Sequence, residues 1–188
     1  MPDRAFYFDL ASPEAYLAAE RALRVLPQPW EWQPVLARRL ESAETFEGFR
    51  CAEEERIFRA EFERRAHEQG VQAVRWPAPF PFDSELAMLA AVYAKRIGRC
   101  VSFAQAAFRQ AFAAGHALDD SDTVLLAAAA CEMHPAAVLK AVGSRGVREE
   151  LDRASSEAAA AGVSDVPAVR EGARVLIGAG SLEGALAR

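Results

Sequence analysis

The sequence predicts an α/β fold in which a block of helices separates two segments that contain strands. Three features of the chain point to this fold. Residues 5–35 have a β–α–β pattern, residues 52–142 are mostly helical in period, and residues 147–187 have an α–β–β–α pattern. The length of 188 residues fits one ordinary domain, or one domain that carries an insertion.

The first segment begins with a short aromatic strand over Ala5–Leu10. Residues 12–14, Ser-Pro-Glu, then supply a capping serine, a proline at the first helical position and a glutamate in the first turn. The helix is expected to end near Val25, before two prolines. The alternating stretch Trp30–Val35 predicts a second strand, parallel to the first because the crossover is long.

The middle of the chain is predicted to be a helical block. It starts with a highly charged helix over Ala52–Gln69, on which Ile57, Phe58, Phe62 and Ala66 share one side. The proline-rich stretch Trp76–Phe82 cannot be helical and must be extended. Further helices are predicted from Asp83 or Ser84 to Ile97, and over Val101–Ala114, Asp122–Met133 and Pro135–Val142.

The last segment returns to strands. An amphipathic helix is predicted over Val147–Ala161, and a short helix over Ser181–Ala187. Between them, Val163–Val169 and Ala173–Ile177 read as the two strands of a hairpin with a short loop that contains glycine.

The order of these elements predicts two structural parts. When the helical block is left out, the remaining order is that of a thioredoxin fold. We therefore expect a discontinuous thioredoxin-like domain over residues 1–38 and 145–188, with an inserted all-helical subdomain over residues 39–144.

Composition narrows the classes of function. The chain has 22 Lys and Arg against 27 Asp and Glu, a formal net charge of -5. This balance argues against nucleic acid and anionic membranes as partners. No apolar run approaches the roughly 20 residues of a membrane helix, and no signal peptide is recognised at the N-terminus.

The cysteines and histidines predict no metal site. Cys51, Cys100 and Cys131 are odd in number and far apart, so we expect a reducing cytoplasm and three buried, inert thiols. The three histidines lie on different predicted helices without metal-ligand spacing.

Four stretches of the chain resemble one protein family. They are FYFDLASPEAYLAAERAL at residues 6–23, WQPVLARRL at 32–40, RWPAPFPFDSELAMLAA at 75–91 and GVSDVPAVREGARVLIGAGSLEGAL at 162–186. Together they resemble the 2-hydroxychromene-2-carboxylate isomerases and kappa-class glutathione transferases, which have a DsbA-like thioredoxin fold with an inserted helical domain. The resemblance covers nearly the whole chain in the right order.

The resemblance implies a cytoplasmic, homodimeric enzyme that uses glutathione and no metal. The isomerases interconvert an aromatic chromene carboxylate and its open-chain form in aromatic degradation, so the expected substrate is a small conjugated aromatic carboxylate. A kappa-type glutathione transferase and a non-redox binding protein of the same fold are the alternatives. Disulfide oxidoreductases of this superfamily carry CxxC where this chain has residues 12–15, Ser-Pro-Glu-Ala, which excludes dithiol chemistry there.

Ser12 is the candidate catalytic residue that the resemblance implies, and Ser12 and Pro13 would contact glutathione. A helix N-terminus favours negative charge, and the Ser12 hydroxyl would donate a hydrogen bond to a thiolate. The alternative is that Ser12 only caps its helix.

Val166, Pro167 and Ser181 complete the glutathione contacts that the resemblance implies. It predicts a cis Val166–Pro167 bond, with the backbone of Val166 pairing with the cysteine portion of glutathione. Ser181 would supply one hydrogen bond.

Three departures from the family pattern predict weakened glutathione binding. Asp165 stands where the family has glycine, and its carboxylate would repel a thiolate. Residues 178–181, Gly-Ala-Gly-Ser, lack the acid that holds the glutathione amino group, and residues 41–46 lack a family asparagine.

Other residues leave two interpretations open. Tyr16 is expected to pack in the core rather than face a pocket. Asp9 is either solvated or a support for the Ser12 loop. Trp76, Phe80 and Phe82 either line an aromatic substrate pocket or pack between the two subdomains.

Overall fold

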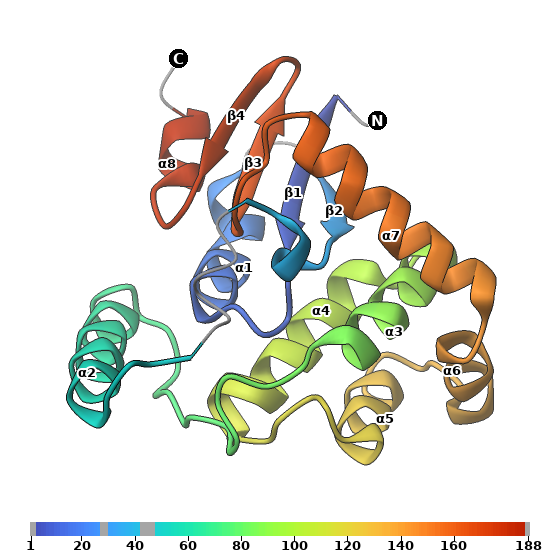
Figure 1. Ribbon diagram of the computed structural model, residues 1–188, viewed down its shortest axis with the longest axis horizontal. Helices are drawn as coiled ribbons and strands as arrows, with labels where there is room; N and C mark the ends of the chain where they lie inside the picture. The colour runs from blue at the N-terminus through green and yellow to red at the C-terminus, as the bar shows by residue number, and fades with distance from the viewer. Residues whose placement is uncertain (1–2, 27–29, 42–47, 187–188) are drawn as a thin grey trace.

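The computed structural model describes residues 3–26, 30–41 and 48–186. Figure 1 shows a small sheet at one end of the molecule, a cluster of helices at the other, and α2 set apart beside them. The elements in chain order are β1 (Arg4–Phe8), α1 (Pro13–Val25), β2 (Glu31–Pro34), the 3₁₀ turn η1 (Ala37–Arg39), α2 (Ala52–Glu68), α3 (Glu85–Arg96), α4 (Cys100–Arg109), the π-helical turn η3 (Gln110–Ala114), α5 (Ser121–Ala129), α6 (Pro135–Val142), α7 (Arg145–Ala160), β3 (Ala168–Glu171), β4 (Arg174–Ile177) and α8 (Ser181–Leu186).

The sheet has four strands in the order β2-β1-β3-β4. β1 pairs parallel with β2, and Phe6 lies opposite Trp32, so the predicted parallel crossover is confirmed. β1 also pairs antiparallel with β3, and β3 forms the predicted hairpin with β4. The first strand of the chain is therefore central, between segments from opposite ends of the sequence.

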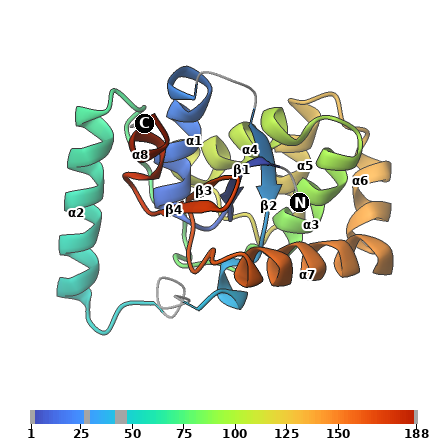
Figure 2. The same cartoon turned by 90° about the horizontal axis from the view of Figure 1, so that it is seen from above.

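Successive side chains of β1 point to opposite faces of the sheet and so contribute to two separate hydrophobic cores. Phe6 and Phe8 point to the larger core, which contains α1, α3 and α4, whereas Ala5 and Tyr7 point to a smaller core that includes α7. Figure 2 shows α1 and α8 on one side of the sheet and α7 on the other. Both faces of β1 are covered, which explains why its aromatic run is apolar without interruption.

The helical cluster is centred on α3, which packs against α4, α5, α6, α7 and β2. Most of its residues are alanine or another apolar type and are buried on several sides, so neighbouring helices can approach closely. None of the described helices is long and apolar enough to cross a membrane. The division into two subdomains by residue number stays a prediction.

Several local expectations need correction. Strand pairing in the hairpin begins only at Ala168, because the N–H of Val166 is bound by the Asp165 side chain and Pro167 has no N–H. The predicted helix over residues 101–114 changes to π geometry at Gln110. The cap of α5 is Asp120, whose carboxylate accepts two backbone N–H groups.

One cysteine is more exposed than expected, and one side of α2 is covered only in part. Cys51 is exposed at the start of α2, whereas Cys100 and Cys131 are buried as predicted. Ile57 is 55% exposed, while Phe62 and Ala66 on the same helix are buried.

Candidate functional site

The start of α1 positions Ser12 as the predicted N-cap. A turn follows β1, and in this turn the Ser12 N–H donates to the Asp9 carbonyl at 3.1 Å. The Ser12 hydroxyl accepts the backbone N–H of Ala15 at 3.1 Å, and Pro13 takes the first helical position. Ser12 is 1% exposed, so its hydroxyl lies below the surface at the helix N-terminus.

The segment before β3 meets Ser12 from the other end of the chain. The Ser12 hydroxyl donates to the Val166 carbonyl at 3.4 Å, across 154 residues of sequence. The Val166–Pro167 bond is cis, as the resemblance implied. The carbonyl of Pro167 accepts the N–H of Gly178 at 2.8 Å, which ties this segment to the end of β4. Of the five candidate residues, Ser12, Pro13, Val166 and Pro167 thus lie together.

Ser181 lies at the first position of α8. Its side chain is buried, and its hydroxyl has no hydrogen-bond partner among the described residues. No hydrogen bond links it to the other four candidate residues in the described parts of the chain. Residues 41–46, which lack the asparagine found in the family that the sequence resembles, lie mainly outside the described residues.

Asp9 supports the Ser12 turn. It is 1% exposed, and its two carboxylate oxygens accept the N–H groups of Ala11 and Ala37, each at 2.9 Å. The hydroxyl of Ser84 also bonds to it. Burial raises the pKa of Asp9, and these three hydrogen-bond donors oppose that rise. One side chain therefore ties together the turn after β1, the segment after β2 and the start of α3.

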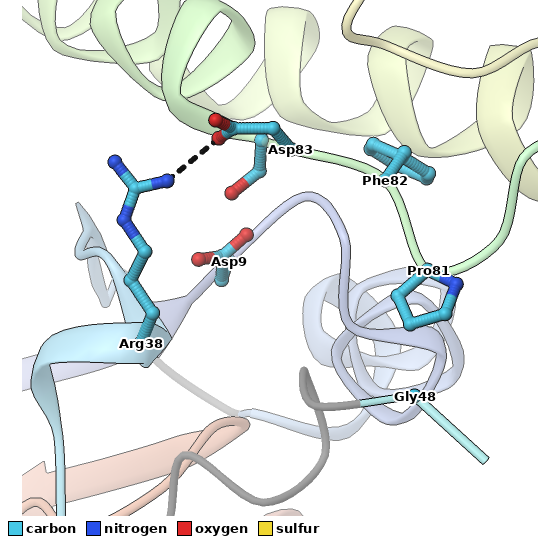
Figure 3. Close-up of a pocket in the computed structure, with 7 residues that line it drawn as sticks. Asp9, Arg38, Gly48, Pro81, Phe82 and Asp83 are labelled. Carbon is cyan, nitrogen blue, oxygen red and sulfur yellow. Dashed lines mark hydrogen bonds and ion pairs between the residues drawn. The ribbon is translucent and has the colours of Figure 1, made fainter.

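A cavity of about 440 Å³ lies beside this turn. Its lining comes from Asp9, Arg38, Gly48 and residues 81–84. Figure 3 shows Arg38 reaching Asp83 on one side of the cavity, with the ring of Phe82 and Pro81 on another side. The Arg38–Asp83 distance is 2.7 Å, and a second contact joins Arg38 to Glu85. This volume is within the usual range for small-molecule sites, roughly 300–1,000 Å³.

The aromatic side chains of the proline-rich segment divide between the two interpretations. Trp76 packs against Phe62 and Phe80, with ring centroids 5.2 and 4.9 Å apart, and donates to Glu63 at 2.7 Å. Through Phe112, this cluster joins α2 to the other helices of the helical block. Phe82 instead lines the cavity. Trp76 and Phe80 therefore pack rather than line the cavity, but their ring contacts lie within residues 39–144 and not between the two predicted subdomains. Phe82 borders the cavity from the core.

Charged groups surround the start of α1. The carboxylate of Asp165 accepts the Val166 N–H at 2.7 Å and is partly buried. Burial raises the pKa of Asp165, the hydrogen bond from Val166 opposes that rise, and the nearby negative charge of Glu14 adds a smaller increase. Glu14 in turn pairs with Arg65 of α2, at 2.9 Å for one oxygen. The pairing of Arg65 and Glu14 and the place of Arg38 at the cavity were not predicted from the sequence.

Tyr16 packs in the core, as predicted. Its ring stacks on Phe112 with centroids 5.5 Å apart, and burial raises its pKa to about 12. Its hydroxyl is buried without a hydrogen-bond partner among the described residues.

Few of the described residues could support thiol or metal chemistry. The buried thiol of Cys100 has its pKa raised to about 12 by burial, so it is protonated at neutral pH. Since no cysteine lies at residues 12–15, dithiol exchange cannot occur at the start of α1. The described residues include no group of three or more His, Cys, Asp or Glu that could hold a metal ion.

Comparisons with known proteins agree with this architecture. The chain matches the model of the DSBA-like thioredoxin domain over residues 5–187, while no curated protein sequence matches it. A solved structure of 2-hydroxychromene-2-carboxylate isomerase is similar with a TM-score of 0.83 and 20% identity, covering 98% of this chain and 94% of that one. A probable DsbA oxidoreductase from Streptomyces coelicolor has a TM-score of 0.78 and 17% identity, covering 96% and 85% of the two chains. At these identities the structural matches show the fold alone, and the family match shows that this chain belongs to the DsbA-like thioredoxin domain family.

Proposed function

We propose that this protein is a glutathione-dependent isomerase of small conjugated aromatic carboxylates, with Ser12 as its catalytic residue. The observation that carries the proposal is the meeting of the Ser12 hydroxyl and the Val166 carbonyl, 3.4 Å apart, at the N-terminus of α1. The absence of sulfur at residues 12–15 supports non-redox chemistry at this position.

The residues at the start of α1 fit a thiolate in part. A helix N-terminus stabilises negative charge through its free N–H groups and dipole, and the Ser12 hydroxyl can turn from Val166 to donate to sulfur. Pro13 lacks an N–H, and the Ser12 cap already takes the N–H of Ala15, so the hydroxyl is the main adjustable donor.

Bound glutathione would supply a thiolate that adds reversibly to a conjugated carbon and leaves unchanged. The protein would stabilise that thiolate and hold the substrate while a carbon–carbon bond rotates. Because the thiol is recovered and no electrons are lost, the reaction needs no oxidant or reductant.

The neighbouring cavity supports a substrate of this class. Phe82, which is largely buried in the core, borders the cavity with apolar surface. Arg38 offers a guanidinium group whose five N–H donors are only partly used by Asp83 and Glu85. A planar guanidinium group is well suited to a carboxylate. Asp9 lines the same cavity and supports the Ser12 turn, so it links the two parts of the site.

Calorimetric titration with reduced glutathione tests the proposal. Wild-type protein should bind in the micromolar to low-millimolar range, and Ser12→Ala should bind at least tenfold more weakly. Asp120→Ala is the matched control, since Asp120 caps α5 in the same way but bonds only within that helix start. No heat from the wild-type protein at several millimolar glutathione would contradict the proposal.

A second candidate is a non-redox binding protein with the same fold. It is favoured by the burial of Ser12 and by the hydrogen bond that the Val166 N–H already makes to the Asp165 carboxylate. A third, the kappa-type transferase, would consume glutathione with an electrophile, whereas an isomerase would not. Measuring the glutathione thiol concentration during turnover distinguishes the transferase, which lowers it, from the isomerase, which leaves it unchanged.

The homodimer and the cytoplasmic location stay predictions. Light scattering coupled to gel filtration would measure the oligomeric state directly.

A further inference from the structure

Val166 has no free backbone group to offer a ligand. Its N–H donates to the Asp165 carboxylate at 2.7 Å, and its carbonyl accepts from the Ser12 hydroxyl at 3.4 Å. The next residue, Pro167, has no N–H. The backbone edge that faces the start of α1 is therefore satisfied by the protein's own side chains.

Asp165 is placed where its charge opposes an anionic ligand. It is partly buried, and Glu14 on α1 adds a second negative charge nearby, which itself is paired with Arg65 on α2. The carboxylate of Asp165 therefore interacts with the Val166 N–H and with the charge of Glu14. Glu14 in turn pairs with Arg65. Among the described residues, the Val166 N–H is the hydrogen-bond donor that the structure gives to the carboxylate of Asp165.

We propose that Asp165 is a specificity-determining, self-blocking residue: its carboxylate occupies the Val166 amide and hinders binding of a thiol peptide at Ser12. This inference rests on the proposed function, because it concerns the same site. An amide N–H makes one strong hydrogen bond at a time, so a peptide carbonyl must displace the Asp165 carboxylate before it can pair with Val166. Loss or protonation of that carboxylate should therefore strengthen binding.

The first experiment compares three proteins by calorimetric titration with reduced glutathione at pH 7. Asp165→Ala removes the charge and the acceptor, and should bind at least tenfold more tightly than wild type. Asp165→Asn keeps an acceptor oxygen without the charge and should fall between them. Asp119→Asn, a change of an exposed acid outside this site, serves as the matched control and should bind like wild type.

The second measurement uses the wild-type protein alone, without a ligand and without a substituted variant. In ¹H–¹⁵N spectra of the wild-type protein, the Val166 amide signal should shift with pH as Asp165 titrates, with a pKa above the ordinary value for aspartate, because burial and Glu14 disfavour the charge. The direct hydrogen bond makes this amide the reporter of that carboxylate.

The outcomes separate this inference from the proposed function. Binding by both proteins, with tighter binding by Asp165→Ala, supports both. Binding by Asp165→Ala without binding by wild type supports the blocking role and contradicts the proposed function. If wild type binds glutathione and Asp165→Ala binds equally or more weakly, the blocking role is overturned and the proposed function stands. A Val166 amide that does not respond to pH also overturns the blocking role. No heat from any of the proteins overturns the proposed function, and with it the role of Asp165 toward glutathione.

Discussion

The carboxylate of Asp9 and the backbone N–H of Ala37 lie 2.9 Å apart, although 28 residues separate them in the chain. The same side chain accepts the N–H of Ala11 and bonds to the Ser84 hydroxyl. Three segments that border the cavity therefore depend on one buried acid. This arrangement predicts that Asp9 contributes to the stability of the whole fold as well as to the shape of the site.

Asp9→Asn should lower the free energy of unfolding by about 2 kcal/mol. Asparagine has one acceptor oxygen and an NH₂ group, so one backbone N–H would face another donor in a buried place. Urea unfolding followed by circular dichroism measures the loss. Asp119→Asn changes an exposed acid and should stay within about 0.5 kcal/mol of wild type. Equal stability of the two variants would contradict the role assigned to Asp9.

Tyr16→Phe should stabilise the protein by about 1 kcal/mol, because it removes a buried hydroxyl without a hydrogen-bond partner and keeps the ring that stacks on Phe112. Tyr93→Phe is the control at a partly exposed tyrosine, where a change within about 0.5 kcal/mol is expected. Loss of stability in Tyr16→Phe would mean that the hydroxyl has a partner, such as an ordered water.

The same tyrosine predicts a pH dependence. Its pKa is about 12 in the folded protein and near 10 when unfolded, so the folded state favours the neutral phenol. The unfolded state loses its proton first, and the free energy of unfolding should fall between pH 10 and pH 12 by this contribution. At pH 11 the advantage of Tyr16→Phe over wild type should be larger than at pH 9 by about 1 kcal/mol. A constant difference over that range would contradict the assignment.

The pair of Glu14 and Arg65 should couple α1 to α2. Both side chains are about a quarter exposed and make a two-point contact, so a double-mutant cycle with alanine should give about 1 kcal/mol. The pair of Glu53 and Arg56 is far more exposed and lies within α2 alone, so its coupling should be clearly weaker than that of Glu14 and Arg65. Thermal unfolding of the single and double variants supplies both numbers.

Gly115 should tolerate alanine less well than Gly98. Both have a left-handed backbone, with φ of 82° and 73°, so both substitutions cost about 1 kcal/mol from strain. A Cβ at Gly115 would also lie 3.3 Å from the Cβ of Arg75 and 3.4 Å from the carbonyl of Trp76, whereas Gly98 faces open space. Gly115→Ala should therefore lose about 1 kcal/mol more than Gly98→Ala in urea unfolding. Equal losses would show that the segment at Arg75 shifts freely.

The parts of the structure that local sequence determines were predicted. The Ser-Pro-Glu start of α1 depends on groups within one helical turn, and the parallel pairing of β1 and β2 depends on the length of the crossover. The family resemblance added the cis bond at Pro167. Each of these signals lies within a short stretch or a general rule of chain geometry.

The parts of the structure that depend on residues far away in the chain were not predicted. The two interpretations of Asp9 could be separated only when Ala37 and Ser84 were seen beside it. Exposure of Cys51 depends on what packs around the start of α2. The Val166 N–H, which lies in the predicted hairpin strand Val163–Val169, bonds to the Asp165 side chain instead of to a neighbouring strand. The sequence predicted repulsion by Asp165, whereas the structure adds its contact with the neighbouring amide.

The distance of 154 residues between Ser12 and Val166 also governs how the site arises during synthesis. At about 5–20 residues per second, translation takes roughly 8 to 30 seconds to travel from one residue to the other. In that interval β1 lacks β3, so one of its edges is open to strands of other chains. The nascent chain thus carries β1, the strand that leads to Ser12, with one edge unpaired until translation has passed the residues of β3.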